Sequence, residues 1–219
     1  MNKIDKEIAL ITGASRGLGY QVAKLLAKKD MHVIGIARTL GGLESLSDEI
    51  SQSNGTSTMV PMNLTNDEEL NSLGQVLFER WRKIDIFIHC ASISAPMSPI
   101  VSVSLKDFEH SLAINVRATL KLIQILDPLI KISKIKKAVF VDDTNSGKFL
   151  SSYSASKAAT REIIKIYKEE SKRIGVKVIS FQPKPMPTSL RARFYPGEDR
   201  QRLSTCISQA KKLITEANL

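Results

Sequence analysis

The stretch IALITGASRGLGYQVAKLL, residues 8–26, decides the fold. An apolar run at 8–12 predicts a buried strand, and apolar residues at helical spacing from residue 18 onward predict a helix. Between them lie Gly13, Gly17 and Gly19, which permit a sharp turn, a close approach to a ligand and tight helix–strand packing. The helix N-terminus offers free N–H groups and a partial positive charge. The stretch therefore predicts a strand–turn–helix unit that binds the pyrophosphate of a dinucleotide.

Short apolar runs alternate with longer stretches of helical periodicity along the whole chain. The six expected strands are residues 8–12, 32–37, 58–62, 84–89, 138–142 and 176–182. The expected helices are residues 18–29, 43–53, 67–81, 105–130, 151–173 and 201–217. Strands separated by such helices indicate βαβ units and a parallel sheet covered on both faces. Since no segment has linker composition, the sequence predicts a single doubly wound α/β domain over residues 1–219.

Composition narrows the class of protein further. The chain has 219 residues, 42% hydrophobic and 25% charged, as in ordinary soluble domains. Residues 1–7 are polar and the apolar run after them is too short for a leader peptide, so we expect a cytoplasmic protein. Two cysteines, Cys90 and Cys206, are too few for a disulfide framework, and the three histidines are too scattered for a metal site. The net charge of +10 favours an anionic cofactor or an acidic partner, whereas nucleic acid binding would rest on charge alone.

The end of the second expected strand predicts which dinucleotide is bound. In this fold a carboxylate after that strand accepts a hydrogen bond from a ribose hydroxyl, whereas an arginine pairs with a ribose phosphate. Here Ala37 and Arg38 follow the strand, and Arg16 in the glycine loop adds a second cation. We therefore expect NADP(H) rather than NAD(H).

A second motif, SSYSASKAA, lies at residues 151–159. Tyr153 and Lys157 are four residues apart, so on a helix both side chains lie on one face. An ammonium beside a phenol lowers the pKa of the tyrosine, which gives a proton donor and acceptor near neutral pH. Together with TGASRGLG at 12–19 and Asn115 between the two, this motif resembles the short-chain dehydrogenase/reductase family from Ile8 to Thr188.

The resemblance implies a Rossmann-like sheet with strand order 3-2-1-4-5-6, and an NADP-dependent oxidoreductase that moves hydride between nicotinamide and a carbonyl or alcohol. It implies that Tyr153 is the general acid/base, that Lys157 holds the nicotinamide ribose and that Asn115 supports a proton-relay water. Residues 63–64 match the adenine contact, and Thr188 matches a carboxamide contact. The cofactor-binding residues expected on this basis are Gly13, Ser15, Arg16, Gly17, Leu18, Gly19, Arg38, Asn63, Leu64, Ala91, Tyr153, Lys157, Pro183 and Thr188.

The family's catalytic serine has no direct counterpart. Counting back three residues from Gly147 gives Thr144, whose hydroxyl can polarise a carbonyl. Ser146 is the competing candidate. Asp142 and Asp143 precede them, and their charge would oppose an alkoxide-like transition state if they point inward.

Three further segments depart from the family pattern. HCAS at 89–92 replaces the usual NNAG and keeps only the alanine, so His89 and Cys90 are interpreted as structural replacements. In PKPMP at 183–187, Lys184 replaces a flexible glycine. The chain ends one helix after the sixth strand, so we expect no seventh strand and no tetramer. The apolar helix at 112–126 favours a homodimer, unless it is simply buried in its own domain.

The residues say less about the substrate. Residues 92–104 and 187–200 are expected to cover the nicotinamide. Apolar side chains expected to line the pocket are Ile93, Met97, Phe149, Met186, Phe194 and Tyr195. Arg191, Arg193 and Arg200 suit either an acidic substrate or a solvated face.

Two hypotheses follow for function. The first is an NADP(H)-dependent carbonyl reductase, with reduction of a 3-oxoacyl group on an acyl carrier protein as a narrower version that the positive charge favours. The second is a catalytically impaired NADP(H)-binding regulatory or interaction protein, because the family's serine, NNAG and PG residues are missing.

Overall fold

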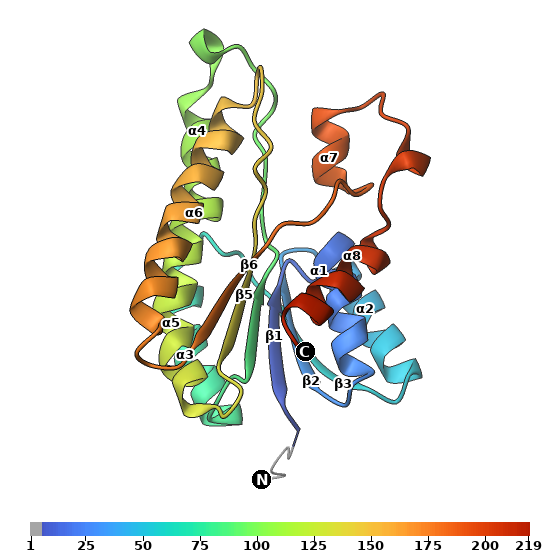
Figure 1. The fold of residues 1–219 in the computed structure, drawn as a ribbon, viewed down its shortest axis with the longest axis vertical. Helices are drawn as coiled ribbons and strands as arrows, with labels where there is room; N and C mark the ends of the chain where they lie inside the picture. The colour runs from blue at the N-terminus through green and yellow to red at the C-terminus, as the bar shows by residue number, and fades with distance from the viewer. Residues whose placement is uncertain (1–5) are drawn as a thin grey trace.

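Six short apolar segments form six parallel strands in the computed structural model, which describes residues 6–219 (Figure 1). The strands are β1 Ile8–Thr12, β2 His32–Ala37, β3 Thr56–Pro61, β4 Ile86–His89, β5 Lys137–Val141 and β6 Lys177–Phe181. Their order is β3-β2-β1-β4-β5-β6, as the family resemblance implies. The polar residues 1–5, on which part of the expectation about a leader rests, lie outside the described residues.

Helices cover both faces of the sheet (Figure 1). One layer is α1 Gly17–Ala27, α2 Leu40–Gln52 and α8 Cys206–Glu216; the other is α3 Asp67–Trp81, α5 Ala118–Ile132 and α6 Ser151–Ser171. Side chains of β1 alternate between the two cores, with Ile8 and Leu10 packed in one and Ala9 and Ile11 in the other. All five residues of β1 are buried, which explains its continuous apolar run. Within residues 6–219 no helix combines the length and apolar character that crossing a bilayer requires.

The helix expected at 105–130 is interrupted in its middle. It consists of α4 Leu105–Leu112, a π-helical turn at Ala113–Arg117 and α5. Such π-turns change the helical register, and they are frequent at functional sites. This turn holds Asn115.

Most of the apolar side chains around this helix are buried within the chain's own domain. Ile114, Leu122, Ile123 and Leu126 are buried, whereas Leu120 is 42% exposed. The structure thus favours the interpretation that the helix is buried, and the homodimer stays a prediction.

The region after β6 contains a helix that the sequence did not predict. α7 Ser189–Phe194 starts at Thr188, whose hydroxyl accepts a hydrogen bond from the Arg191 N–H at 3.2 Å. The final helix, expected from residue 201, begins instead at Cys206, because the Thr205 side chain caps its first turn. It packs against α1. In the described chain no seventh strand joins the sheet.

Candidate active site

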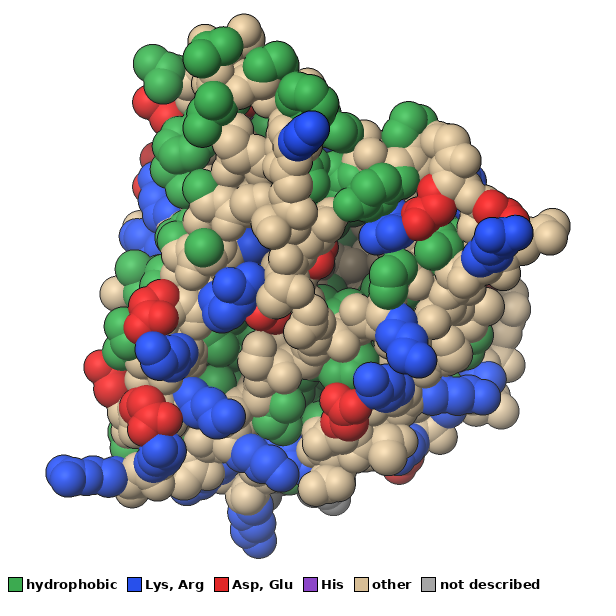
Figure 2. All heavy atoms as spheres, turned by 45° about the horizontal axis from the view of Figure 1, so that its top comes forward, with side chains coloured by type: hydrophobic (Ala, Val, Ile, Leu, Met, Phe, Trp, Pro, Cys, Tyr) green, Lys and Arg blue, Asp and Glu red, His purple; other side chains and the backbone are tan. Residues whose placement is uncertain are grey.

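A cavity of about 970 Å³ opens at the carboxyl ends of the strands. In Figure 2 the molecule is hollowed between two upper lobes, with acidic side chains visible near the centre of this face. Ligands of doubly wound sheets bind at this edge. Every residue expected to bind the cofactor lines the cavity, as does Thr144.

The glycine loop brings backbone close to the cavity. Gly13 and Gly17 have φ angles of +71° and +62°, which side chains disfavour. A Cβ on Gly13 would lie 2.8 Å from the Ala91 nitrogen, and one on Gly19 would lie 2.5 Å from the Gly13 carbonyl oxygen. Arg16, which precedes α1, makes no side-chain cap hydrogen bond to the described chain. The N-terminus of α1 therefore suits the pyrophosphate of a dinucleotide.

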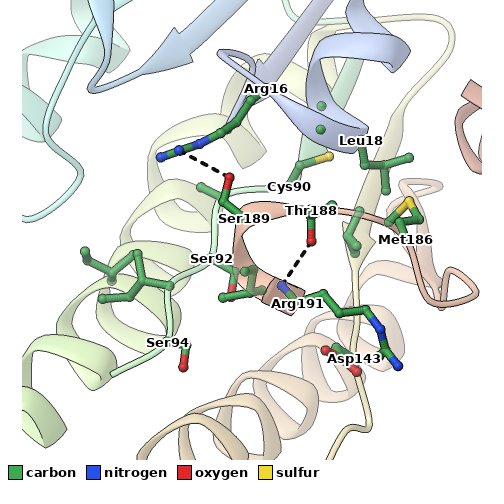
Figure 3. A pocket seen from close by; sticks show the side chains of 18 of the residues that line it. Arg16, Leu18, Cys90, Ser92, Ser94, Asp143, Met186, Thr188, Ser189 and Arg191 are labelled. Carbon is green, nitrogen blue, oxygen red and sulfur yellow. Dashed lines mark hydrogen bonds between the residues drawn. The ribbon is translucent and has the colours of Figure 1, made fainter. Parts of the chain in front are cut away.

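Two arginines lie near this loop. Arg38 is exposed directly after β2, and Thr39 follows it, so no carboxylate stands at this strand end. The Arg16 guanidinium lies 3.5 Å from the Ser189 hydroxyl of α7 (Figure 3). The Asn63 amide oxygen accepts hydrogen bonds from the Thr65 N–H and hydroxyl, at 3.2 and 3.0 Å, so Asn63 also shapes the turn after β3.

Tyr153 and Lys157 lie on α6 and face the cavity, although both are nearly enclosed, with exposures of 2% and 5%. The Lys157 ammonium donates a hydrogen bond to the Val141 carbonyl oxygen at 3.0 Å. Burial lowers the pKa of Lys157, and the neighbouring Asp142 carboxylate opposes this change. The two side chains share one face of the helix, as their spacing predicts.

The Tyr153 hydroxyl has a carboxylate as its hydrogen-bond partner. Its hydroxyl donates a hydrogen bond to the Asp143 carboxylate at 2.7 Å. Burial and then this carboxylate raise the pKa of Tyr153 well above that of an ordinary phenol. The expectation that Lys157 gives Tyr153 a lowered pKa is therefore wrong in this structure.

Thr144, expected as the counterpart of the family's serine, lines the same cavity as Tyr153, and its catalytic role stays a prediction. The Thr144 hydroxyl accepts a hydrogen bond from the Gln182 amide at 2.5 Å, and Ser146 is exposed on the loop. Asp143, rather than Thr144, makes the hydrogen bond with the Tyr153 hydroxyl. In the sequence Asp143 is only a charge that would oppose an alkoxide-like transition state, and no signal in the residues alone selects it as the partner of Tyr153.

Asn115 is buried beneath the cavity and connects three segments. Its side-chain oxygen accepts from the Ile93 N–H at 2.9 Å, and its amide donates to the Ile93 carbonyl and the Ser156 hydroxyl, each at 2.9 Å. The carbonyl oxygen of Asn115 accepts from the Thr119 and Thr160 hydroxyls, each at 2.7 Å. Asn115 thus holds the loop after β4 against α6, and its role with a relay water stays a prediction.

His89 and Cys90 have structural surroundings, as expected. The two ring nitrogens of His89 lie 2.7 Å from the Thr12 hydroxyl and 2.9 Å from the Thr119 hydroxyl. Burial lowers the pKa of His89 to about 3, so the ring is neutral. Burial also raises the pKa of the Cys90 thiol to about 12, which makes it a poor nucleophile.

The segments expected to cover the nicotinamide meet over the cavity. Phe194 of α7 packs on Tyr153 with ring centroids 4.9 Å apart, and Arg193 donates to the Ser94 carbonyl at 3.0 Å. Arg191 forms two 2.6 Å hydrogen bonds with Glu198. Ile93, Met186 and Phe194 line the cavity, but Met97, Phe149 and Tyr195 do not and are 41%, 50% and 39% exposed.

Comparison with known proteins agrees with this geometry. The family model described as short chain dehydrogenase matches residues 7–199. The chain therefore belongs to the short-chain dehydrogenase family, whose members are oxidoreductases. An uncharacterized oxidoreductase from Staphylococcus aureus is 27% identical over 206 residues, which are 93% of this chain and 87% of the relative.

Solved structures share the fold over nearly the whole chain. A short chain dehydrogenase from Shigella flexneri has a TM-score of 0.88 and 25% identity, covering 97% of this chain and 86% of that one. A second structure from Shigella flexneri, complexed with NADP, has a TM-score of 0.85 and 25% identity over 94% of this chain and 89% of its own.

Proposed function

We propose that the chain is an NADP(H)-dependent oxidoreductase that transfers hydride between the nicotinamide and a carbonyl or alcohol carbon of a small molecule. The observation that carries the proposal is one cavity lined by both the glycine loop with Arg16 and Arg38 and the Tyr153–Lys157 pair. The NADP complex of the 25% identical Shigella flexneri protein supports the same cofactor.

Each residue would have a distinct task. The N-terminus of α1 would bind the pyrophosphate, and Arg16 and Arg38 would bind the ribose phosphate. Lys157 would bind the nicotinamide ribose. The bound cofactor supplies the hydride acceptor or donor. Tyr153 would pass a proton to the substrate oxygen, for which its hydroxyl must leave Asp143.

A nucleotide titration tests the cofactor. Wild type is expected to quench or enhance NADPH fluorescence at micromolar concentrations and to bind NADH more weakly. Arg38→Ala is expected to remove the preference, since a charge-assisted pair is worth about 1.5–3 kcal/mol, or roughly 10- to 100-fold. Arg173→Ala, an exposed change in the turn between α6 and β6, is the matched control. A preference that survives in Arg38→Ala contradicts this assignment.

A second candidate is an NADP(H)-binding regulatory or interaction protein with impaired catalysis. The hydrogen bond from Tyr153 to Asp143 and the raised tyrosine pKa favour it, because they hinder proton transfer. Tyr153→Phe separates the two. If Tyr153 is the acid, turnover falls by about 10²–10⁴-fold while NADPH affinity is kept. Absence of turnover in wild type as well as in Tyr153→Phe, with NADPH bound by both, favours the regulatory protein.

The narrower proposals concern partners. A 3-oxoacyl substrate on an acyl carrier protein fits the net charge of +10, because carrier proteins of this kind would have to be attracted as acidic partners. A homodimer and a cytoplasmic location are part of the same proposal. Of the three arginines that suit either an acidic substrate or a solvated face, Arg191 pairs with Glu198. Docking through the remaining charges is expected to weaken steeply with salt, and salt-insensitive docking would contradict it.

A further inference from the structure

A carboxylate lines the cavity beside Tyr153. Asp143 directly follows Asp142 after β5, and its side chain lies in the pocket below α7 (Figure 3). One carboxylate oxygen accepts from the Asn145 N–H at 2.8 Å, and the other accepts from the Tyr153 hydroxyl at 2.7 Å. Any group that reaches the Tyr153 hydroxyl therefore also meets this negative charge.

The cations around Asp143 are directed at other partners. The Arg161 guanidinium pairs with the Asp142 carboxylate at 2.9 Å and reaches only the backbone carbonyl of Asp143. The Lys157 ammonium donates to the Val141 carbonyl, and Arg191 pairs with Glu198. Among residues 6–219, Asp143 forms no ion pair, so its hydrogen-bond donors are the neutral tyrosine hydroxyl and a backbone N–H.

Charge at this position selects among reactions. A carbonyl that accepts hydride gains negative charge on its oxygen, and a carboxylate a few ångströms away opposes that change. A protonated imine carries positive charge and an N–H donor before it accepts hydride, and a carboxylate stabilises both. The same argument holds for a protonated amine in the reverse direction.

On this basis, and resting on the proposed function, we infer that the site takes protonated imines and their amines as its preferred substrate class, with Asp143 accepting the hydrogen bond from the charged nitrogen. The imine carbon gains a hydride, two electrons and one proton, from the reduced nicotinamide, which is thereby oxidised. The π pair of the C=N bond becomes the lone pair of the amine nitrogen. The neutral amine then takes a proton from solvent.

Tyr153 has a different role in this reaction from the one in carbonyl reduction. No proton has to pass from the protein, because the iminium nitrogen is already protonated. A phenol that retains its proton fits that requirement, and the raised pKa of Tyr153 is consistent with it. Its hydroxyl holds the Asp143 carboxylate in position.

Two substrates of equal ring size test the inference: the cyclic imine methylpyrroline and the ketone cyclopentanone, each with NADPH. Wild type is expected to show the larger kcat/KM for the imine. Asp143→Asn is expected to lower that value by about 10- to 100-fold, the size of one charge-assisted hydrogen bond, without lowering the value for the ketone. Asp143→Ser, which replaces the carboxylate with a hydroxyl, repeats the test. Asp48→Asn, the same change on exposed α2, is the control.

A binding measurement gives a readout without turnover. Pyrrolidinium and cyclopentanol are titrated calorimetrically into the protein, with and without NADP⁺. Wild type is expected to prefer pyrrolidinium, and Asp143→Asn is expected to lose the preference. Equal pyrrolidinium affinity of wild type and Asp143→Asn, or an unchanged imine-to-ketone ratio, overturns the inference. If the ketone alone is reduced, the proposed function stands without it, whereas failure to bind NADPH refutes the proposed function itself.

Discussion

Gly19 lies in the first turn of α1, where its Cα faces the backbone of the glycine loop. A Cβ there would lie 2.5 Å from the Gly13 carbonyl oxygen and 3.3 Å from the Cys90 Cβ. Because backbone cannot move aside cheaply, we expect Gly19→Ala to destabilise the protein by about 1–3 kcal/mol in urea unfolding. Gly41→Ala in α2, where a Cβ meets no atom within 4 Å, should instead stabilise by about 0.4–1 kcal/mol. The same sign for both changes would contradict the close approach.

His89 makes stability depend on pH through its burial. Its pKa is lowered from 6.5 to about 3 in the fold, so between these values the unfolded chain binds one more proton. The stability of wild type should therefore fall as the pH drops below 6.5, with the contribution of His89 reaching about 2 kcal/mol between pH 7 and pH 5. His89→Asn lacks this proton uptake. We expect the difference between pH 7 and pH 5 in its unfolding free energy to be smaller by that amount.

The comparison of wild type with His89→Asn isolates one histidine. Burial also lowers the pKa of His32, which is present in both proteins and so cancels. Urea titrations at both pH values give the measurement. Identical pH dependence in the two proteins would mean that the fold does not lower the pKa of His89.

The positions of site residues were predictable where a motif lies on a helix or strand. They were not predictable in the loop after β5, which is shorter than is usual in the family. The glycine loop, Tyr153 and Lys157 lie on regular elements, so their spacing determines their positions. Thr144 was located by counting along an irregular segment. In such a segment no regular period fixes which side chain meets Tyr153, and the structure places Asp143 there.

At the scale of elements, Asn115 joins the π-turn between α4 and α5 to the loop after β4. Asn115→Ala would leave the Ile93 N–H and carbonyl and the Ser156 hydroxyl without this partner. Since unsatisfied buried groups cost about 1–3 kcal/mol each, we expect a loss of several kcal/mol and faster proteolysis within residues 93–104. Thermal unfolding and timed digestion with mass mapping measure the two effects.

The control for Asn115→Ala is the same change at Asn66. Asn66 caps α3 by accepting from the Glu68 and Glu69 N–H groups, at 3.0 and 3.4 Å. Its loss should cost about 1 kcal/mol and leave the 93–104 loop resistant. Equal cleavage of that loop in both variants would show that Asn115 does not hold it.

Strands and long helices were predictable because their apolar period reflects burial on one or two faces. All six strands lie within two residues of the expected positions, and their order is the one that the family resemblance implies. The π-turn was not predictable, because apolar residues continue through it. α7 was missed because it is six residues long and follows a proline-rich segment, where local pattern carries little information.

At the scale of the whole molecule, the cavity draws on both halves of the sheet. Its walls include residues after β1 and β2, residues after β4 and β5, and side chains of α6 and α7. A dinucleotide in this cavity would contact elements separated by most of the chain. Its binding should therefore stabilise the fold as a unit rather than one part of it.

If nucleotide binding stabilises the whole fold, calorimetry can test the prediction that residues 1–219 form a single domain. A ligand that binds only the folded state at 100 times its dissociation constant adds about 2.7 kcal/mol to the unfolding free energy. For a chain of this size the midpoint should rise by about 5–11 °C. We expect one calorimetric transition, shifted as a whole by NADPH and less by an equal concentration of NADH. Two transitions, of which NADPH moves only one, would instead place the nucleotide on one independently folding part, because mass action stabilises only what unfolds together with the site.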